Sequence, residues 1–326
     1  MWVGRFTDSP YRFLRVYHRN AIITVKRIII QAEVLGFCSG VKLAMGKALK
    51  ARSDFPHRRI FTFGELIHNN EAICLLEKKH IYALEKEKSI AVTNDYSDAI
   101  IIVCAHGIEY MALKQLQKNF FRVIDATCPH VLQSQKKAEK AVKQGTLFLI
   151  GEKTHQEVLS IKSHAELVHG GTCTVIESEN EAHNFVPDKT SQSFYVIGQT
   201  TLKQTEYQAI IDILADKISQ CDSASAAKTA TFIVYNTICP ATQKRQAALL
   251  ELTKHCDAIL VIGGKNSANT KRLFQSAREH TKNAFLIENA AEIPSEIYRF
   301  ERIGITAGAS TPDFVIDEID KKLRES

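Results

Sequence analysis

The 326-residue sequence predicts an α/β protein that is built from three related units. Cys38, Cys128 and Cys239 lie roughly a hundred residues apart, and each stands where an apolar strand pattern changes into a helix pattern. After each cysteine, short apolar runs that end in glycine and a polar loop recur in step, and helix-period segments separate them. Such a pattern is typical of βαβ units with buried parallel strands.

Each unit contains the same elements in the same order. A strand leads into the cysteine and a helix in segments 28–49, 120–142 and 231–252. About two dozen residues after the cysteine comes a second strand, in IFTFGELIHNN (60–70), LFLIGEKTHQEV (147–158) and ILVIGGKNSANT (259–270). A third strand follows, in IIIVCAHG (100–107), FYVIGQTT (194–201) and RIGITAGAS (302–310).

The loops after the second and third strands carry most of the unusual polar residues. Ligands of open α/β sheets bind beyond the carboxyl ends of the strands. If the three units face one another, these loops and the cysteines converge on one pocket. The alternative is one ordinary doubly wound sheet whose loops are polar by default. The loop residues concerned are His68, His106, His155, Glu157, Thr200, Thr201, Ser267, Asn269 and Ser310.

Composition and charge narrow the function classes. Apolar and charged fractions of 45% and 24% are those of a globular protein. No apolar stretch is long enough to span a bilayer, so no membrane partner is expected. The net charge of +6 is concentrated in residues 1–30, which hold six basic residues and one acidic residue. Because the remaining sequence is nearly neutral, nucleic-acid binding is not indicated.

The segment 1–27 is interpreted as a basic N-terminal extension. An Arg-rich, acid-poor leader is one feature of an organelle transit peptide, but this one is poor in serine and runs directly into the first strand. We expect a cytoplasmic, bacterial protein, with a plastid as the alternative if the extension is a transit peptide. Eight cysteines without a secretory signal favour a reducing compartment. Five of them fall outside the repeated position and are interpreted as structural: Cys74, Cys104, Cys173, Cys221 and Cys256.

The position of the three repeated cysteines suggests metal ligation. Cys128 and Cys239 each precede a proline at a helix start, where the helix dipole is expected to lower the pKa of the thiol. Cys38 lies between Gly36 and Gly40, which permit close backbone approach. A nucleophile needs one sulfur and a disulfide two, so three favour a metal. Zinc with a fourth ligand and a [4Fe–4S] cluster with one open iron both fit.

The polar loops favour a small phosphorylated or diphosphorylated substrate. Their side chains are neutral or cationic donors beside helix N-termini, which favour anions. Neither a phosphate-binding P-loop motif nor a dinucleotide-binding glycine fingerprint is present, so nucleotide binding is not indicated. Glu157 is the candidate for proton transfer, and a surface carboxylate at a helix start is the alternative interpretation.

As a set, these motifs resemble the 4-hydroxy-3-methylbut-2-enyl diphosphate reductase family of the non-mevalonate isoprenoid pathway. The matches run in order from about residue 28 to 320 and cover nearly all of the chain. They are GFCSGV (36–41), ELIHNN (65–70), CAHG (104–107), DATCP (125–129), THQEV (154–158), QTTL (199–202), KNSANT (265–270) and TAGAS (306–310).

The resemblance implies three similar α/β domains with small, mostly parallel sheets in a pseudo-threefold arrangement around a central [4Fe–4S] cluster. The expected divisions are 28–127, 128–238 and 239–326. Cys38, Cys128 and Cys239 would hold the cluster. Electrons would come singly from a donor such as ferredoxin or flavodoxin, and the allylic hydroxyl would be removed to give isopentenyl and dimethylallyl diphosphate.

The resemblance also implies roles for the loop residues. Glu157 and Thr200 would orient the hydroxyl and relay the proton, with His155 beside them. Three departures occur. Ala268 stands where the family commonly has a second serine, leaving its backbone N–H to serve; Gln156 replaces a frequent proline; and the leader before residue 28 has no counterpart in the family pattern. A non-enzymatic iron–sulfur sensor and a zinc-dependent hydrolase are the competing functions. The diphosphate would be held by His68, His106, Ser267, Asn269 and Ser310, and the substrate-binding residues as a whole would also include His155, Thr200 and Ala268.

Overall fold

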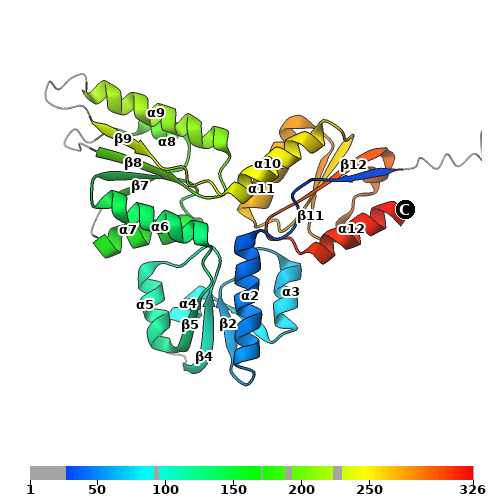
Figure 1. Cartoon of the computed structure of the whole chain (residues 1–326), viewed down its shortest axis with the longest axis horizontal. Helices are drawn as coiled ribbons and strands as arrows, with labels where there is room; N and C mark the ends of the chain where they lie inside the picture. The colour runs from blue at the N-terminus through cyan, green and yellow to red at the C-terminus, as the bar shows by residue number, and fades with distance from the viewer. Residues whose placement is uncertain (1–26, 92–94, 170–171, 188–192, 223–229, 326) are drawn as a thin grey trace, which may run out of the picture.

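The computed structural model has three lobes that meet at a common centre (Figure 1). Within the described residues each lobe contains one four-stranded sheet, and every strand pairing in these sheets is parallel. The predicted fold class is therefore confirmed. Of the predicted extension 1–27, only Arg27 belongs to the described part. The structure describes residues 27–91, 95–169, 172–187, 193–222 and 230–325.

The first lobe contains a sheet with the strand order β3-β2-β4-β5. Buried apolar clusters lie on both faces of this sheet, one of them against α2. The strands are β2 (Ile60–Phe63), β3 (Ile81–Leu84), β4 (Tyr96–Val103) and β5 (Phe120–Asp125), and the helices are α2 (Ser39–Asp54), α3 (Asn70–Glu77), α4 (Lys86–Ile90) and α5 (Tyr110–Asn119).

The second lobe repeats this plan with the order β7-β6-β8-β9. Its central strands are buried on both sides, which explains their continuous apolar sequence. The strands are β6 (Thr146–Ile150), β7 (Cys173–Ile176), β8 (Ser193–Gly198) and β9 (Thr231–Val234), and the helices are α6 (Pro129–Val142), α7 (Gln156–His169), α8 (Glu179–Asn184) and α9 (Gln204–Asp222).

The third lobe has the corresponding order β11-β10-β12-β1. Its outer strand β1 (Ile28–Gln31) comes from the beginning of the described chain and pairs with β12. Two short 3-10 turns, Ala290–Glu292 and Ser295–Arg299, connect β11 to β12. The other elements are β10 (Ala258–Ile262), β11 (Ala284–Ile287), β12 (Arg302–Ala307), α10 (Pro240–Thr253), α11 (Ala268–His280) and α12 (Asp313–Glu325).

The position of β1 corrects one predicted domain boundary. The sequence division placed residue 28 at the start of the first domain, but Ile28–Gln31 belongs to the third sheet. In every lobe, the strand that precedes a cysteine helix belongs to the sheet of the preceding unit. Like β1, strands β5 and β9 pair with the third strand of that unit. Sequence reading missed this for β1 because its partner β12 lies about 270 residues away in the chain.

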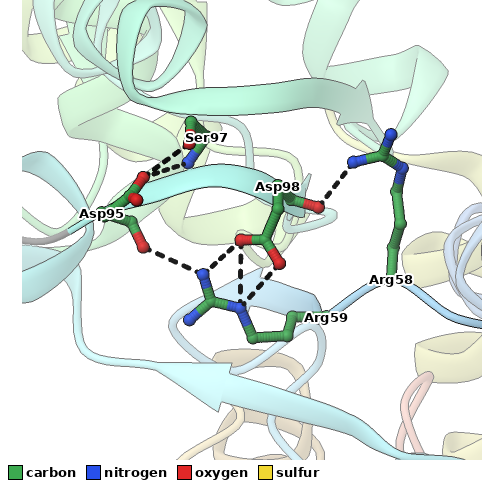
Figure 2. A network of polar contacts seen from close by, with 5 residues as sticks. All are labelled: Arg58, Arg59, Asp95, Ser97 and Asp98. Atoms are coloured by element: carbon green, nitrogen blue, oxygen red, sulfur yellow. Dashed lines mark hydrogen bonds and ion pairs between the residues drawn. The ribbon is translucent and has the colours of Figure 1, made fainter.

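A polar network fixes the amino-terminal ends of the strands in the first lobe (Figure 2). Arg59 directly precedes β2, and its guanidinium binds the carboxylate of Asp98 in β4 and, at 2.9 Å, the carbonyl of Asp95. Arg58 donates to the backbone carbonyl of Asp98 at 2.9 Å. The Asp95 carboxylate accepts hydrogen bonds from the backbone N–H and the hydroxyl of Ser97. The network is exposed and lies at the opposite end of the sheet from the cysteine loops, so it organises strand ends rather than the site.

No helix in the described ranges is both long and apolar enough to cross a membrane.

Candidate cysteine-centred active site

The three repeated cysteines occupy equivalent positions at the starts of three helices. Cys38, Cys128 and Cys239 are the N-cap residues of α2, α6 and α10, each with extended backbone dihedral angles. Proline follows Cys128 and Cys239 at the first helical position, where its missing N–H and fixed φ are compatible with a helix start. The predicted strand-to-helix position is therefore observed in all three units.

The backbone N–H of each cysteine is also hydrogen-bonded to the loop that follows the third strand of the preceding unit. The backbone N–H of Cys128 donates to the Ala105 carbonyl, and that of Cys239 to the Thr200 carbonyl, both at 2.9 Å. The Cys38 N–H donates to the Ala309 carbonyl at 3.1 Å. The chain thus forms a closed ring of three equivalent contacts, which brings thiols from distant segments to the centre.

One pocket contains all of the predicted site residues. Its volume, including the mouth that opens to solvent, is about 740 Å³. This arrangement supports convergence of three units rather than a single doubly wound sheet. The predicted residues that line it are Cys38, Cys128, Cys239, His68, His106, His155, Glu157, Thr200, Ser267, Ala268, Asn269 and Ser310.

Gly40 leaves space between two of the sulfurs. A Cβ at this position would lie 2.6 Å from the Cys128 Sγ and 3.8 Å from the Cys38 Sγ. Both sulfurs therefore lie within 4 Å of one point that only glycine leaves open. This close approach, together with the soft donor set, fits a compact inorganic group bound by thiolates from different lobes.

Three thiols from three lobes are a donor set that a thiolate-bound metal centre could use. Within the part of the chain that the structure describes, no three His, Cys, Asp or Glu side chains are arranged to hold one metal ion. Three thiolates that each bind a different iron need not surround a single point. Backbone N–H groups of the following helix face the sulfurs, for example Val41 N at 3.4 Å from the Cys38 Sγ. Such N–H···S contacts are one way in which proteins adjust iron–sulfur potentials.

The expected lowering of the thiol pKa is wrong for two of the cysteines in the metal-free protein. Burial raises the pKa of Cys128 to about 11, although the N–H groups of His130 and Val131 act in the opposite direction. Burial likewise raises the pKa of Cys239. Desolvation outweighs the helix N-terminus at these positions. Binding of a metal by these two cysteines would therefore have to release their protons.

Glu157 and Thr200 form a buried pair in the second lobe. Glu157, near the start of α7, is 1% exposed. It accepts the Thr200 N–H at 2.7 Å and pairs with the Thr200 hydroxyl at 2.9 Å. Burial raises the pKa of Glu157 to about 7, against the opposing effect of the Thr200 hydrogen bonds and Arg272. A carboxyl with this pKa can hold or release a proton near neutral pH. Because Glu157 is buried, its interpretation as a surface carboxylate is wrong.

Three histidines form one wall of the pocket. The rings of His68 and His106 stack with their centroids 4.7 Å apart, and His106 meets His155 edge to face at 5.4 Å. His155 Nδ1 accepts the Glu157 N–H at 3.1 Å, which leaves Nε2 as its N–H donor. Burial lowers the pKa of His155 to about 4 and that of His106 well below its ordinary value. The His106 and His155 rings are therefore neutral in the ligand-free pocket.

The third lobe contributes a helix N-terminus and an unpaired amide. Ser267 is the N-cap of α11, and its side chain accepts the Thr270 N–H at 3.4 Å. The Asn269 Nδ2 atom is buried without a hydrogen-bond partner. Ser310 Oγ lies 3.3 Å from the His68 carbonyl of the first lobe. A buried unpaired donor beside a helix N-terminus is suited to an anionic ligand.

Sequence reasoning did not single out several neighbours of these residues. His130 and Thr242 line the pocket and follow Cys128 and Cys239 by two and three residues, so their proximity to the cysteines was the available signal. Lys86 of the first lobe binds the Gln156 side chain of the second. Nothing in the local sequence indicates that contact. Gln156 thereby links two lobes.

The fold and site define a class of protein: a three-lobed α/β protein in which one cysteine from each lobe faces a pocket lined by histidines and a helix N-terminus. The family model described as LytB protein matches residues 29–324, so the chain belongs to the LytB family. A Treponema denticola protein named 4-hydroxy-3-methylbut-2-enyl diphosphate reductase is 44% identical over 303 residues, which cover 91% of this chain and 99% of that protein.

Two solved structures are also similar. The first is described as the E-1-hydroxy-2-methyl-but-2-enyl-4-diphosphate reductase from Plasmodium falciparum, with a TM-score of 0.78 and 26% identity. The match covers 92% of this chain and 88% of that one. The second is described as (E)-4-hydroxy-3-methyl-but-2-enyl diphosphate reductase, the terminal enzyme of the non-mevalonate pathway. Its TM-score is 0.64 and its identity 29%, over 91% of this chain and 99% of that one.

Proposed function

We propose that this protein is a 4-hydroxy-3-methylbut-2-enyl diphosphate reductase, which removes the allylic hydroxyl to form isopentenyl and dimethylallyl diphosphate. The observation that carries the proposal is one pocket that joins three cysteines from three lobes to the Glu157–Thr200 pair and an anion-binding wall. The names of the relatives agree with this chemistry. The reaction consumes two electrons and two protons and releases the hydroxyl as water.

Cys38, Cys128 and Cys239 are proposed to hold a [4Fe–4S] cluster. When bound, the cluster would supply electrons singly and an iron without a protein ligand, which acts as a Lewis acid. A one-electron donor such as ferredoxin or flavodoxin is proposed as the partner. Free thiols that bind iron require a reducing compartment, and a bacterial cytoplasm is the proposed location.

The diphosphate is proposed to bind at the wall formed by the histidines and the third lobe. The unpaired Asn269 Nδ2, the N-terminus of α11, and the hydroxyls of Ser267 and Ser310 supply hydrogen-bond donors. His68, His106 and His155 add ring N–H groups from the facing lobes. Ala268 contributes its backbone N–H at the first turn of α11. Binding energy from this non-reacting group can orient the hydroxyl at the cysteines.

Glu157 is proposed as the proton donor and Thr200 as its relay. The shared hydrogen bonds fix the carboxyl and leave the Thr200 hydroxyl able to contact both Glu157 and the substrate oxygen. His155 supports this geometry, because its Nδ1 accepts the Glu157 N–H. Burial excludes water from the carboxyl and keeps a proton available at neutral pH.

The test is an anaerobic assay with the diphosphate substrate and a one-electron reductant. The protein reconstituted with iron and sulfide is expected to be brown and to produce both diphosphates. Cys128→Ser should bleach the protein and abolish turnover, with Cys74→Ser, an exposed cysteine outside the pocket, as the matched control. Full iron content in Cys128→Ser would contradict its role as a ligand. A colourless, zinc-containing active protein or a brown protein without turnover would contradict the function.

A further inference from the structure

His68 differs from the other histidines of the pocket wall in the partner of its ring. Its Nδ1 lies 2.7 Å from Oε2 of Glu65, which is the third residue before it in the same loop. A carboxylate only accepts hydrogen bonds, so Nδ1 carries the hydrogen of this contact. The hydrogen bond to His68 also holds the pKa of Glu65 below its ordinary value, so Glu65 is ionised at neutral pH. The substrate wall described above makes no use of Glu65.

The hydrogen on Nδ1 determines what His68 offers to a ligand. A neutral imidazole has one N–H, so a neutral His68 presents its Nε2 as an acceptor. The arrangement in His155 is the reverse, because its Nδ1 accepts the Glu157 N–H and its Nε2 carries the hydrogen. The oxygens of a diphosphate are mainly acceptors at neutral pH. His68 can therefore donate to them from Nε2 only as an imidazolium.

A second cavity gives the His68 ring access to solvent behind the wall. Its volume, including the mouth that opens to solvent, is about 670 Å³. The His68 and His106 rings line both this cavity and the substrate pocket. A proton can therefore reach His68 from solvent while a ligand fills the substrate pocket. The other polar residues that line the second cavity include Glu65, Lys86, Gln156 and Asn266.

The charged and titratable groups around His68 allow one positive charge on its ring. Glu65 is in direct contact with the ring, whereas the cation Lys86 of α4 lines the same cavity and opposes a further positive charge. The His106 ring stacks on His68 with its centroid 4.7 Å away, and burial keeps it neutral, so a cation at His68 meets no second imidazolium. The remaining groups that line the two cavities here are the neutral His155, the titratable Glu157, and the uncharged Asn266 and Ser310 of the third lobe.

We propose that Glu65 is a positioning residue for the diphosphate, which fixes the hydrogen on Nδ1 of His68 and stabilises the imidazolium form in which His68 binds the anion. The inference rests on the proposed function for the identity of the ligand. Binding takes up one proton from solvent through the second cavity, and release of the ligand returns it. The new N–H at Nε2 donates a charge-assisted hydrogen bond, which is roughly twice as strong as a neutral one.

The first test measures binding of inorganic pyrophosphate to the reconstituted protein by isothermal titration calorimetry. Buffers with different ionisation enthalpies give the number of protons taken up for each pyrophosphate bound. At pH 8, where an ordinary imidazole is mainly neutral, Glu65→Gln should take up about one proton fewer than the unmodified protein. Its Kd should be about tenfold higher, the difference between a charged and a neutral hydrogen bond. Ionisation of pyrophosphate and of Glu157 is common to both proteins and cancels in the comparison.

Glu65→Gln separates the charge of Glu65 from its geometry, because the amide oxygen of glutamine can still accept the Nδ1–H of His68. A purely structural Glu65 predicts unchanged proton uptake and Kd in this variant, and that result overturns the proposal. Glu65→Asp keeps the negative charge and should retain most of the proton uptake. Glu77→Gln removes the same charge from an exposed position on α3 of the same lobe and should change neither quantity.

His68→Asn keeps the proposal open to refutation if Glu65→Gln does not fold. Asparagine does not ionise, so this variant should also take up about one proton fewer than the unmodified protein. Unchanged proton uptake would show that His68 is not the group that is protonated. In the His68→Asn background, the Glu65→Gln change should have no further effect on Kd, because the two residues act as one unit.

The second test is kinetic and uses the diphosphate substrate. The diphosphate is the non-reacting end of the substrate, so Glu65→Gln should raise KM about tenfold at pH 8 and leave kcat nearly unchanged. The rise should be smaller at pH 6, because an ordinary imidazole is largely protonated there without help from a carboxylate. An equal KM ratio at both pH values, or a loss confined to kcat, overturns the proposal.

The two tests distinguish failure of this inference from failure of the proposed function. An active reductase in which Glu65→Gln binds pyrophosphate with the original Kd and proton uptake overturns the role of Glu65 alone. Proton uptake that depends on Glu65, in a brown protein without turnover, supports the role of Glu65 and contradicts the proposed function.

Discussion

At the scale of single residues, the pocket contains groups whose ionisation is set by burial. Glu157 is protonated more readily than an ordinary carboxyl, and His155 and His106 less readily than ordinary imidazoles. In each case burial is the largest cause, and it favours the neutral form. The ligand-free site therefore holds two neutral imidazoles beside a carboxyl that titrates near neutral pH.

Glu157→Gln is expected to keep the cluster and lower turnover by about 10²–10⁴-fold, the usual contribution of a general acid. In the unmodified protein, turnover should fall as the pH rises through about 7, because the carboxyl loses its proton. The measurement is the pH profile of kcat for both proteins, with iron content as the control for folding. Near-normal turnover in Glu157→Gln would remove this residue from its role.

The ionisation of Glu157 should also make the free energy of unfolding fall as the pH rises. Because the folded pKa of Glu157 is raised to about 7 above an unfolded value of about 4.3, its favourable contribution is complete below the unfolded pKa. This contribution is lost as the pH rises through about 7. Relative to the unmodified protein, Glu157→Gln should therefore gain stability between pH 5 and 8, as followed by chemical unfolding of the metal-free form.

Gly40→Ala is expected to prevent assembly of the cysteine centre, because the new Cβ would lie 2.6 Å from the Cys128 Sγ. Gly46→Ala on the same helix is the matched control, since no atom lies within 4 Å of its added Cβ. This control should be neutral or more stable by about 0.5–1 kcal/mol through lower unfolded-state entropy. Iron content and thermal unfolding are measured for both variants, and full iron loading in Gly40→Ala would contradict the proposed packing.

At the scale of elements, periodicity and turn residues predicted most of the structure. Local sequence is enough to predict the strands, the position of the polar loops at the strand ends, and the helix starts at Cys38, Cys128 and Cys239. The reason is that a buried strand and a helix N-cap each allow few residue types. The partner of β1 cannot be predicted in this way, because pairing with β12 depends on the closed ring of lobes. The contact between Lys86 and Gln156 was missed for a similar reason: local sequence does not show which side chains meet across a lobe boundary.

The N-terminus of α11 offers a prediction on substrate affinity. Ala268 is 8% exposed at the first helical position and lies beside the unpaired Asn269 amide in the pocket. Ala268→Ser adds a hydroxyl at the anion-binding end of the helix, so KM for the diphosphate should fall several-fold while kcat changes little, as for uniform binding. Ala277→Ser on the same helix, away from the pocket, is the control. An unchanged KM in Ala268→Ser would mean that this turn does not contact the diphosphate.

At the scale of the whole molecule, the site exists only because three lobes close into a ring. Each cysteine N–H is held by the loop of the preceding lobe, and the third lobe returns to the first through Cys38 and Ala309. Further contacts join the third lobe to its neighbours. Asn70 binds Glu288 at 2.9 Å, and Lys203 binds Glu279 at 2.7 Å. Glu157, the proposed proton donor, and α11, the proposed diphosphate-binding helix, therefore lie on different lobes, and the contacts between lobes determine their relative position.

Arg272 provides a test of this coupling. It lies on α11 and donates to the Thr201 hydroxyl at 2.9 Å and to Glu152 at 2.8 Å in the second lobe. Because the Glu152 side chain is 44% exposed, the ion pair contributes only about 0–1 kcal/mol, so thermal unfolding of Arg272→Gln should change little. Arg272 also lowers the pKa of Glu157 from across the lobe boundary.

Loss of that charge in Arg272→Gln should move the fall in kcat to higher pH, because Glu157 then keeps its proton more strongly. KM for the diphosphate should rise several-fold, since α11 is held less firmly against the Thr200 loop. Arg278→Gln is the control, because Arg278 is exposed on the same helix and its side chain donates to the Lys282 carbonyl of its own lobe; this variant should change neither property. A pH profile and KM that stay the same in Arg272→Gln would show that the third lobe does not adjust the proton donor of the second.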